Sequence, residues 1–183
     1  MNEHLTLEQL KAGLARILES PSDDGALEMI AIRPAVDARV ELEECELSAA
    51  EGVHGDRWTA DCHLHLDDGR SHPDVQVAVI NSRLIDLIAQ GRERWSLAGD
   101  NLYVDLNLSS ENLSVGQRLS IGDVIVQVTD QPHNGCRKFT ARYGREAVQF
   151  VNSDQGKRLH LRGIYVRIVQ PGTVRVGDQL VKI

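Results

Sequence analysis

The stretch that sets the fold class is Gly163 to Ile183, with the sequence GIYVRIVQPGTVRVGDQLVKI. Val and Ile recur at alternate positions, as in a strand with one buried face. A Pro-Gly pair interrupts the stretch, and Val-Gly-Asp precedes Leu180. Such pairs mark tight turns between strands. The C-terminal part of the chain is therefore predicted to form consecutive short strands.

An earlier segment repeats this pattern. Residues 113–128, LSVGQRLSIGDVIVQV, also place Val-Gly before a polar residue and then Leu. Ile121-Gly122-Asp123 is a hairpin signal within this segment. Further strands are expected in the segments LEMIAIRP (27–34), ARVELEECEL (38–47), VQVAVIN (75–81) and DNLYVDL (100–106). So many short strands favour a mainly β fold closed into a barrel, because closure removes exposed sheet edges.

A few helices accompany the strands. Residues 6–18 form an apolar stripe behind a Thr6/Gln9 capping box, and a polar linker follows. Residues 1–25 are therefore expected to form an N-terminal helical appendage and linker, and residues 26–183 the barrel domain. A short helix is predicted after 75–81, capped by Asn81 or Ser82. The main helix is predicted over 137–151.

Composition limits the cellular location of the protein and the partners it can bind. No apolar run is long enough to span a bilayer, and the N-terminus lacks the features of a secretory signal. The three cysteines are odd in number and far apart, so we expect a reducing, cytoplasmic location. The net charge of −7 disfavours binding to nucleic acid or to an acidic membrane.

The charge is unevenly distributed. Residues 133–167 contain eight Lys or Arg residues and two acidic ones, which gives this window a charge of +6. One interpretation is a solvated basic helix face. The other is a local anion site beside Cys136, which lies in the segment HNGCRKF (133–139) at the predicted helix start. Nearby cations and a helix N-terminus favour the thiolate form of a cysteine, and Gly135 would let a bulky ligand approach.

Six segments together carry a resemblance to a known family. They are GVHGDR (52–57), GDNLYV (99–104), VGQRLSIGD (115–123), GCRKF (135–139), RYG (142–144) and LRGIYVRIVQPGTVRVGD (161–178). In this order they resemble the MOSC domain, the C-terminal unit of molybdenum cofactor sulfurases, which also occurs free-standing and in amidoxime-reducing enzymes. The similarity runs from about Met29 to Ile183. It implies a β-barrel of the pyruvate-kinase barrel type, with Cys136 as a persulfide carrier or a molybdenum ligand.

The resemblance also implies an anionic pterin cofactor, the molybdenum cofactor, and residues to hold it. Arg57 and Arg162 are the leading contacts to its phosphate or pterin, because Arg forks hold phosphate well. Arg142 and Arg158 come next. For each arginine the alternative is a surface ion pair. The remaining candidates, His133 and Asn134, precede the cysteine and are expected to hydrogen-bond the pterin or an oxo group.

The sequence departs from the family pattern in two ways, which limit what the resemblance implies about function. Gly135 stands where many relatives have proline, and only about 25 mainly helical residues precede the first strand. Amidoxime-reducing relatives usually carry a β-rich subdomain there. The pyridoxal-phosphate-dependent desulfurase half of the fused sulfurases is also missing, so sulfur would come from a separate cysteine desulfurase.

A second cluster, DCHLHLDDGRSH (61–72), contains Cys62, His63, His65 and His72. Its spacing matches no familiar structural zinc pattern. An exposed polar strand and hairpin is the favoured interpretation, with zinc binding as the alternative. Cys45 is expected to be an unreactive strand residue.

The sequence supports three competing hypotheses about function. The first is a molybdenum-cofactor-binding or sulfur-carrier domain in which Cys136 takes a persulfide or binds molybdenum. The second is a molybdenum-dependent reductase of N-hydroxylated compounds, which would need a redox partner. The third is a non-catalytic anion-binding interaction module on the same barrel.

Overall fold

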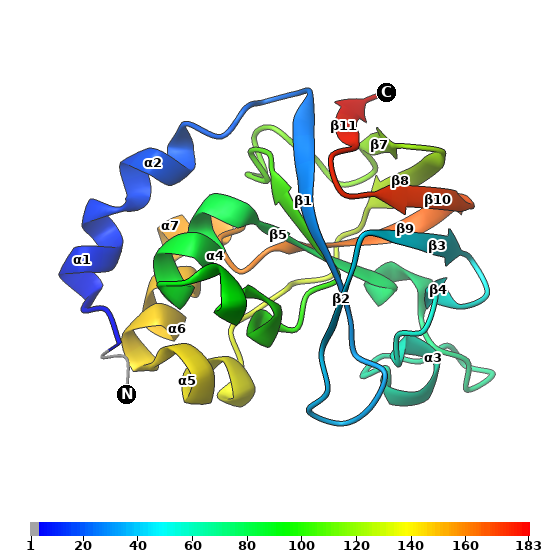
Figure 1. The fold of residues 1–183 in the computed structure, drawn as a ribbon, viewed down its shortest axis with the longest axis horizontal. Helices are drawn as coiled ribbons and strands as arrows, with labels where there is room; N and C mark the ends of the chain where they lie inside the picture. Colours follow the sequence, from blue (N-terminus) through cyan, green and yellow to red (C-terminus); the bar gives the residue numbers. More distant parts are fainter. Residues whose placement is uncertain (1–3) are drawn as a thin grey trace.

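Seven strands of the computed structural model, which describes residues 4–183, close into a barrel (Figure 1). Pairing of the first and last strands, with Gly25 opposite Leu180, completes the ring. Within the described residues one neighbouring pair, β5 with β6, is parallel and the others are antiparallel. The predicted mainly β barrel is confirmed. In ring order the strands are β11 (Gln179–Lys182), β7 (Arg118–Ile121), β8 (Val124–Val128), β9 (Ile164–Gln170), β5 (Val77–Asn81), β6 (Leu102–Asp105) and β1 (Gly25–Ile32).

Alternation along the strands fills the barrel interior. On β9, Ile164, Val166 and Ile168 are buried, while Tyr165 and Arg167 point the other way. The predicted hairpin joins β7 to β8, with Ile121 opposite Val124. On β5 both faces are buried, because the inner face packs in the barrel and the outer face lies under helices.

A smaller sheet lies beside the barrel. Its strands are β10 (Gly172–Arg175), β3 (Glu44–Ser48) and β4 (Gly52–Val53). The segment predicted as strand over 38–47 is divided: β2 (Val40–Leu42) pairs with β1, whereas β3 pairs with β10. The Gly-rich segment 51–58 contains β4 and leads into α3 (Trp58–Asp61).

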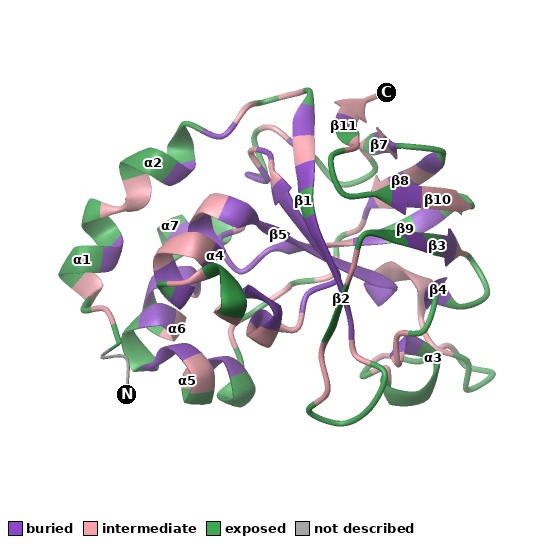
Figure 2. Ribbon diagram, viewed as in Figure 1, coloured by how far each residue is buried: buried purple, intermediate pink, exposed green. Residues whose placement is uncertain are grey.

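Most helices gather on one side of the barrel, and buried residues line the face they share with it (Figure 2). A second apolar core, with Tyr103 and Phe139 among its largest members, lies between the two layers. Asn81 caps α4 as predicted, its side chain accepting from the Leu84 N–H at 2.9 Å. The helices here are α4 (Ser82–Ala89), η2 (Arg92–Ala98), α5 (Arg137–Tyr143), α6 (Arg145–Val151) and α7 (Asp154–Arg158); a further short turn, η1 (Pro73–Val75), precedes β5.

The prediction of two continuous helices was wrong. The N-terminal one is divided at Gly13 into α1 (Leu7–Ala12) and α2 (Leu14–Leu18), although its capping box is present. A Cβ at Gly13 would lie 2.5 Å from Leu87, so the glycine allows close packing on α4. The main helix is divided at Gly144, whose φ of 91° leaves the helical region. Close packing and left-handed backbone, which periodicity does not report, end these helices.

The N-terminal helices share the second core with the barrel domain. Leu10 of α1 and Ile17 of α2 are buried in it, and the Leu7 N–H donates to the Glu146 carboxylate of α6. Across residues 4–183, no helix combines the length and apolarity needed to cross a bilayer.

Candidate functional site

Cys136 lines a cavity of about 380 Å³ at the junction of the barrel and its helices. It is the N-cap of α5 and is exposed, and its side chain makes no capping hydrogen bond. The other walls come from the loop after β1 (33–39), the segment around α3 (57–63) and the turn between η2 and β6 (98–101). Tyr165, on the outward face of β9, forms part of the floor.

Cations dominate the lining of this cavity. Two carboxylates, Asp37 and Asp61, face six cationic side chains. Both acids are mostly exposed and reach a cation only at 3.7 Å and 4.0 Å, respectively. The cationic residues are Arg33, Arg39, Arg57, Lys138, Arg142 and Arg162. The cavity therefore has a net positive charge in a chain that is acidic as a whole.

Arg33 is held by Asp56, whose side chain is 1% exposed. The guanidinium donates to both carboxylate oxygens, from Nε at 3.0 Å and from Nη2 at 2.5 Å. Asp56 belongs to the Gly-Asp-Arg segment, and its carboxylate pairs with Arg33, not with the neighbouring Arg57. This forked pair fixes a cation at the cavity wall.

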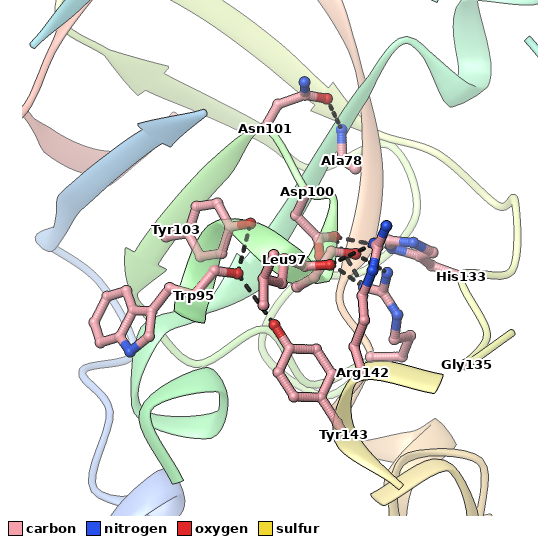
Figure 3. Close-up of polar contacts among 12 residues, drawn as sticks. Ala78, Trp95, Leu97, Asp100, Asn101, Tyr103, His133, Gly135, Arg142 and Tyr143 are labelled. Atoms are coloured by element: carbon pink, nitrogen blue, oxygen red, sulfur yellow. Dashed lines mark hydrogen bonds and ion pairs between the residues drawn. The ribbon is translucent and has the colours of Figure 1, made fainter. Parts of the chain in front are cut away.

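Asp100 and Arg162 form a buried ion pair behind the cavity. Arg162 Nη1 lies 2.9 Å and 2.8 Å from the two Asp100 oxygens, and its Nη2 donates to the Ala98 carbonyl at 3.2 Å. His133 Nδ1 lies 3.6 Å from the same carboxylate, which Figure 3 shows facing the imidazole. The His133 ring packs on Tyr165, with 4.3 Å between centroids. These groups form a rigid polar wall.

Two cations crowd around Gly99. A Cβ placed there would lie 3.6 Å from Arg39 Nη2 and 3.9 Å from Arg142 Nη1. Arg142 is anchored by donating to the Leu97 carbonyl at 2.5 Å (Figure 3). Burial and the neighbouring Arg142 and Arg33 lower the pKa of Arg39. An anion in the cavity would relieve this repulsion.

Polar atoms in the cavity wall also lack hydrogen-bond partners. Among the described residues, seven buried side-chain N or O atoms have no hydrogen-bond partner, and five of them belong to residues that line this cavity. Buried polar atoms are normally satisfied, so this concentration fits a cavity that receives a polar ligand. The five atoms are Arg39 Nε, Arg57 Nε, Trp58 Nε1, His133 Nδ1 and Arg162 Nε.

Comparison with known proteins identifies the family. The family model described as the MOSC domain matches residues 67–181, which include Cys136. The chain belongs to the MOSC domain family. This family is associated with the molybdenum cofactor. No curated protein matches the chain.

Solved structures share the fold of this MOSC domain at low sequence identity. YuaD from Bacillus subtilis is 16% identical with a TM-score of 0.58, over 85% of this chain and 93% of that one. YiiM from Escherichia coli is 18% identical with a TM-score of 0.55, over 88% and 69% of the two chains. YiiM from Geobacillus stearothermophilus is 16% identical with a TM-score of 0.57, over 87% and 75%.

The structure of the MOSC domain brings most of the predicted site residues together. Cys136, Arg57, His133, Arg142 and Arg162 line the cavity. Arg162 is already paired with Asp100, which leaves less of its charge for a ligand.

Two predicted site residues lie elsewhere. Asn134 faces a neighbouring cavity that also measures about 380 Å³, and Arg158, exposed on α7, lines neither of the two. Neither Asn134 nor Arg158 therefore lines the cavity that Cys136 lines.

Sequence reasoning missed Arg33, Arg39 and the role of His63. Arg33 and Arg39 lie at the two ends of the loop between β1 and β2, and neither lies in a motif that indicates a site. His63, considered for zinc, instead lines the cavity. In the described part of the chain no group of three or more His, Cys, Asp or Glu is placed to hold a metal ion. The expected hairpin there is reduced to one bridge, His65 with Ser71.

The remaining thiols differ from Cys136. Cys45 is buried on β3, and burial raises the pKa of its thiol, which agrees with the expected unreactive role. Cys62 is half-buried and donates to the Leu64 carbonyl at 2.9 Å.

Stability should depend on pH through His133. Burial lowers the pKa of His133 well below its usual value, and nearby Arg162 and Arg33 add to the effect. Below about pH 6.5 the unfolded chain binds a proton at this residue that the folded chain does not. The contribution of His133 to the free energy of unfolding is therefore fully present above that pH. As the pH decreases further, this contribution decreases by up to about 1.4 kcal/mol per pH unit. Urea unfolding of the wild type and His133→Gln between pH 7.5 and 5 should show a shallower slope in the variant.

The exposed His65 supplies the control for this prediction. His65→Gln should leave the pH slope unchanged. Equal slopes for the wild type and His133→Gln would show that His133 binds its proton equally in the folded and unfolded states, which would contradict the prediction.

Proposed function

We propose that this MOSC domain binds the molybdenum cofactor, with Cys136 as the ligand to the metal and the cationic cavity as the receptor for the anionic pterin. One observation carries the proposal: an exposed thiol lines a cavity in which cations outnumber carboxylates. Thiolate sulfur is a soft ligand, and arginine forks bind phosphate in two-point contacts. A single site thus offers both kinds of contact.

The residues present fit such a cofactor. The cavity volume of about 380 Å³ lies in the range of small-molecule sites. Three unpaired donors, Arg39 Nε, Arg57 Nε and Trp58 Nε1, would find acceptors on a phosphate or a pterin. When bound, the cofactor would supply a redox-active metal centre.

Five of the six cationic side chains that line the cavity divide into two groups by their ion-pair partners. Arg33 and Arg162 are fixed by Asp56 and Asp100, so they contribute a preorganised positive field. Within residues 4–183, Lys138 makes no ion pair, and the ion pairs of Arg57 and Arg142 are long ones to exposed acids. These side chains are the better candidates for direct binding to phosphate. His133, held neutral by burial, would serve as a hydrogen-bonding group without adding charge.

Sulfur carriage is the second candidate function, and the exposure of Cys136 favours it. A partner protein can reach an exposed thiol directly. The Cys136 thiolate would attack the terminal sulfur of a persulfide on the donor, and the donor cysteine would leave as a thiolate. A pyridoxal-phosphate-dependent cysteine desulfurase is the class of donor that fits this step.

The decisive experiment is analysis of molybdenum and pterin in protein expressed with molybdate. Cys136→Ser should reduce the amount of bound molybdenum by more than about 10-fold. Mutation of residues that only support a metal ligand already lowers metal affinity by about 10- to 100-fold, and Cys136 is the proposed ligand itself. Cys62→Ser is the matched control and should keep its load, because Cys62 does not line the cavity.

Each alternative gives a different result in the same experiment. A Cys136→Ser variant that keeps both molybdenum and pterin would contradict the proposal. Metal-free protein that accepts labelled sulfur from a desulfurase at Cys136 would favour the carrier. Anion binding that survives Cys136→Ser but not Arg57→Ala would favour an interaction module.

A further inference from the structure

The residue before Cys136 is held by one side chain from a distant part of the chain. Asn152, the C-cap of α6, accepts a hydrogen bond from the Gly135 N–H at 2.8 Å through Oδ1. Its Nδ2 donates to the Gly135 carbonyl at 3.1 Å. A single amide therefore satisfies both backbone polar groups of Gly135, much as a neighbouring strand would.

Gly135 lies directly against α6. A Cβ there would come within 3.1 Å of Val151 Cγ2 and 3.4 Å of Val148 Cγ1. The sequence suggested that this glycine makes room for a bulky ligand. In the structure it makes room for α6, which brings the backbone within reach of Asn152.

The backbone is also fixed on the other side of the thiol. The Cys136 carbonyl accepts from the Thr140 N–H at 2.9 Å and from the Thr140 hydroxyl at 3.1 Å. The Cys136 side chain itself makes no capping bond. Backbone restraint on both sides, together with a sulfur that makes no capping hydrogen bond, is the arrangement expected of a group held in place for reaction.

We propose that Asn152 is a positioning residue for Cys136. By holding Gly135 on α6, Asn152 sets the thiol within the cationic cavity, and without Asn152 the thiol samples positions outside the field of the arginines. This inference rests on the proposed function only in taking Cys136 as the reactive group.

The test compares two alkylating reagents that differ in charge. Anionic iodoacetate should be concentrated by the cavity, whereas neutral iodoacetamide should not. The ratio of their rates at Cys136, followed by peptide mass mapping at low ionic strength, reports the field at the sulfur. Asn152→Ala should lower the wild-type ratio by about 10-fold, toward the ratio of the urea-unfolded chain.

Asn112→Ala is the matched control. Asn112 also donates to two backbone carbonyls, those of Ser22 and Asn107, but it lies outside the cavity. The two variants should lose comparable stability, while the rate ratio changes in Asn152→Ala alone. A folded Asn152→Ala protein that keeps the wild-type ratio would overturn the inference, as would an equal change in Asn112→Ala.

A second measurement separates this inference from the proposed function. The Gly135 amide should exchange with deuterium at least about 10-fold faster in Asn152→Ala, because its acceptor is removed. A wild-type ratio no higher than that of the unfolded chain would refute the cationic thiol site. Unchanged amide exchange would refute the restraint by Asn152 itself.

Discussion

Replacing Asp100 by alanine should lower the free energy of unfolding by about 3–5 kcal/mol, because the change leaves an unpaired buried charge on Arg162. The Asp100 side chain is 0% exposed and that of Arg162 is 6% exposed, so water cannot take the place of the lost partner. Urea denaturation at pH 7.5 measures the loss. At the same time Arg162 should lose its fixed orientation at the back of the cavity.

Two controls test this explanation. In the double variant Asp100→Leu/Arg162→Met, both charges are gone, and most of the stability should return. Asp56→Ala should cost less than Asp100→Ala, since its partner Arg33 is 34% exposed and can be hydrated. A double variant as unstable as Asp100→Ala would show that packing, rather than the unpaired charge, accounts for the loss.

Gly163→Ala should lower the free energy of unfolding by roughly 4 kcal/mol, almost as much as Asp100→Ala. Gly163 has a φ of 106°, which costs an alanine about 1–3 kcal/mol. A Cβ there would also lie 2.3 Å from the Val79 carbonyl oxygen, and overpacking adds about 1–3 kcal/mol. The site would be affected as well, because the same Cβ would lie 3.3 Å from His133 Nδ1. Thermal and urea unfolding both measure the change.

Gly177→Ala separates the two contributions. Gly177 has a similar φ of 96°, but within residues 4–183, its chain neighbours aside, no heavy atom lies within 4 Å of the position of its Cβ. Gly177→Ala should therefore lower the free energy of unfolding only by the cost of the positive φ, about 1–3 kcal/mol. Equal losses of stability in Gly163→Ala and Gly177→Ala would show that the contact of the new Cβ with the Val79 carbonyl of β5 does not destabilise the fold.

The strands were predictable because their signals are local. Alternating Val and Ile and the Gly-Asp turn at residues 122–123 specify the β7–β8 hairpin without reference to distant residues. The same holds for β9, where inward and outward positions follow the sequence. The cap of α4 at Asn81 is equally local. The helix breaks at Gly13 and Gly144 were missed because a glycine within a helix costs only about 1 kcal/mol, and tertiary contacts decide the outcome.

By itself the sequence determined the mainly β barrel, the MOSC resemblance and the choice of Cys136 over Cys45 and Cys62. Those conclusions rest on periodicity and motif order, which neighbouring residues along the chain encode.

Only the tertiary structure decided which cations surround the thiol and which are already paired. It placed Arg33 and Arg39 at the cavity, left Arg158 outside, and paired Arg162 with Asp100. The physical reason is that the pairing of β1 with β6, and the packing of α5 against η2, bring together distant parts of the chain. The charge available to a ligand depends on burial and on partners across that junction, and local sequence encodes neither.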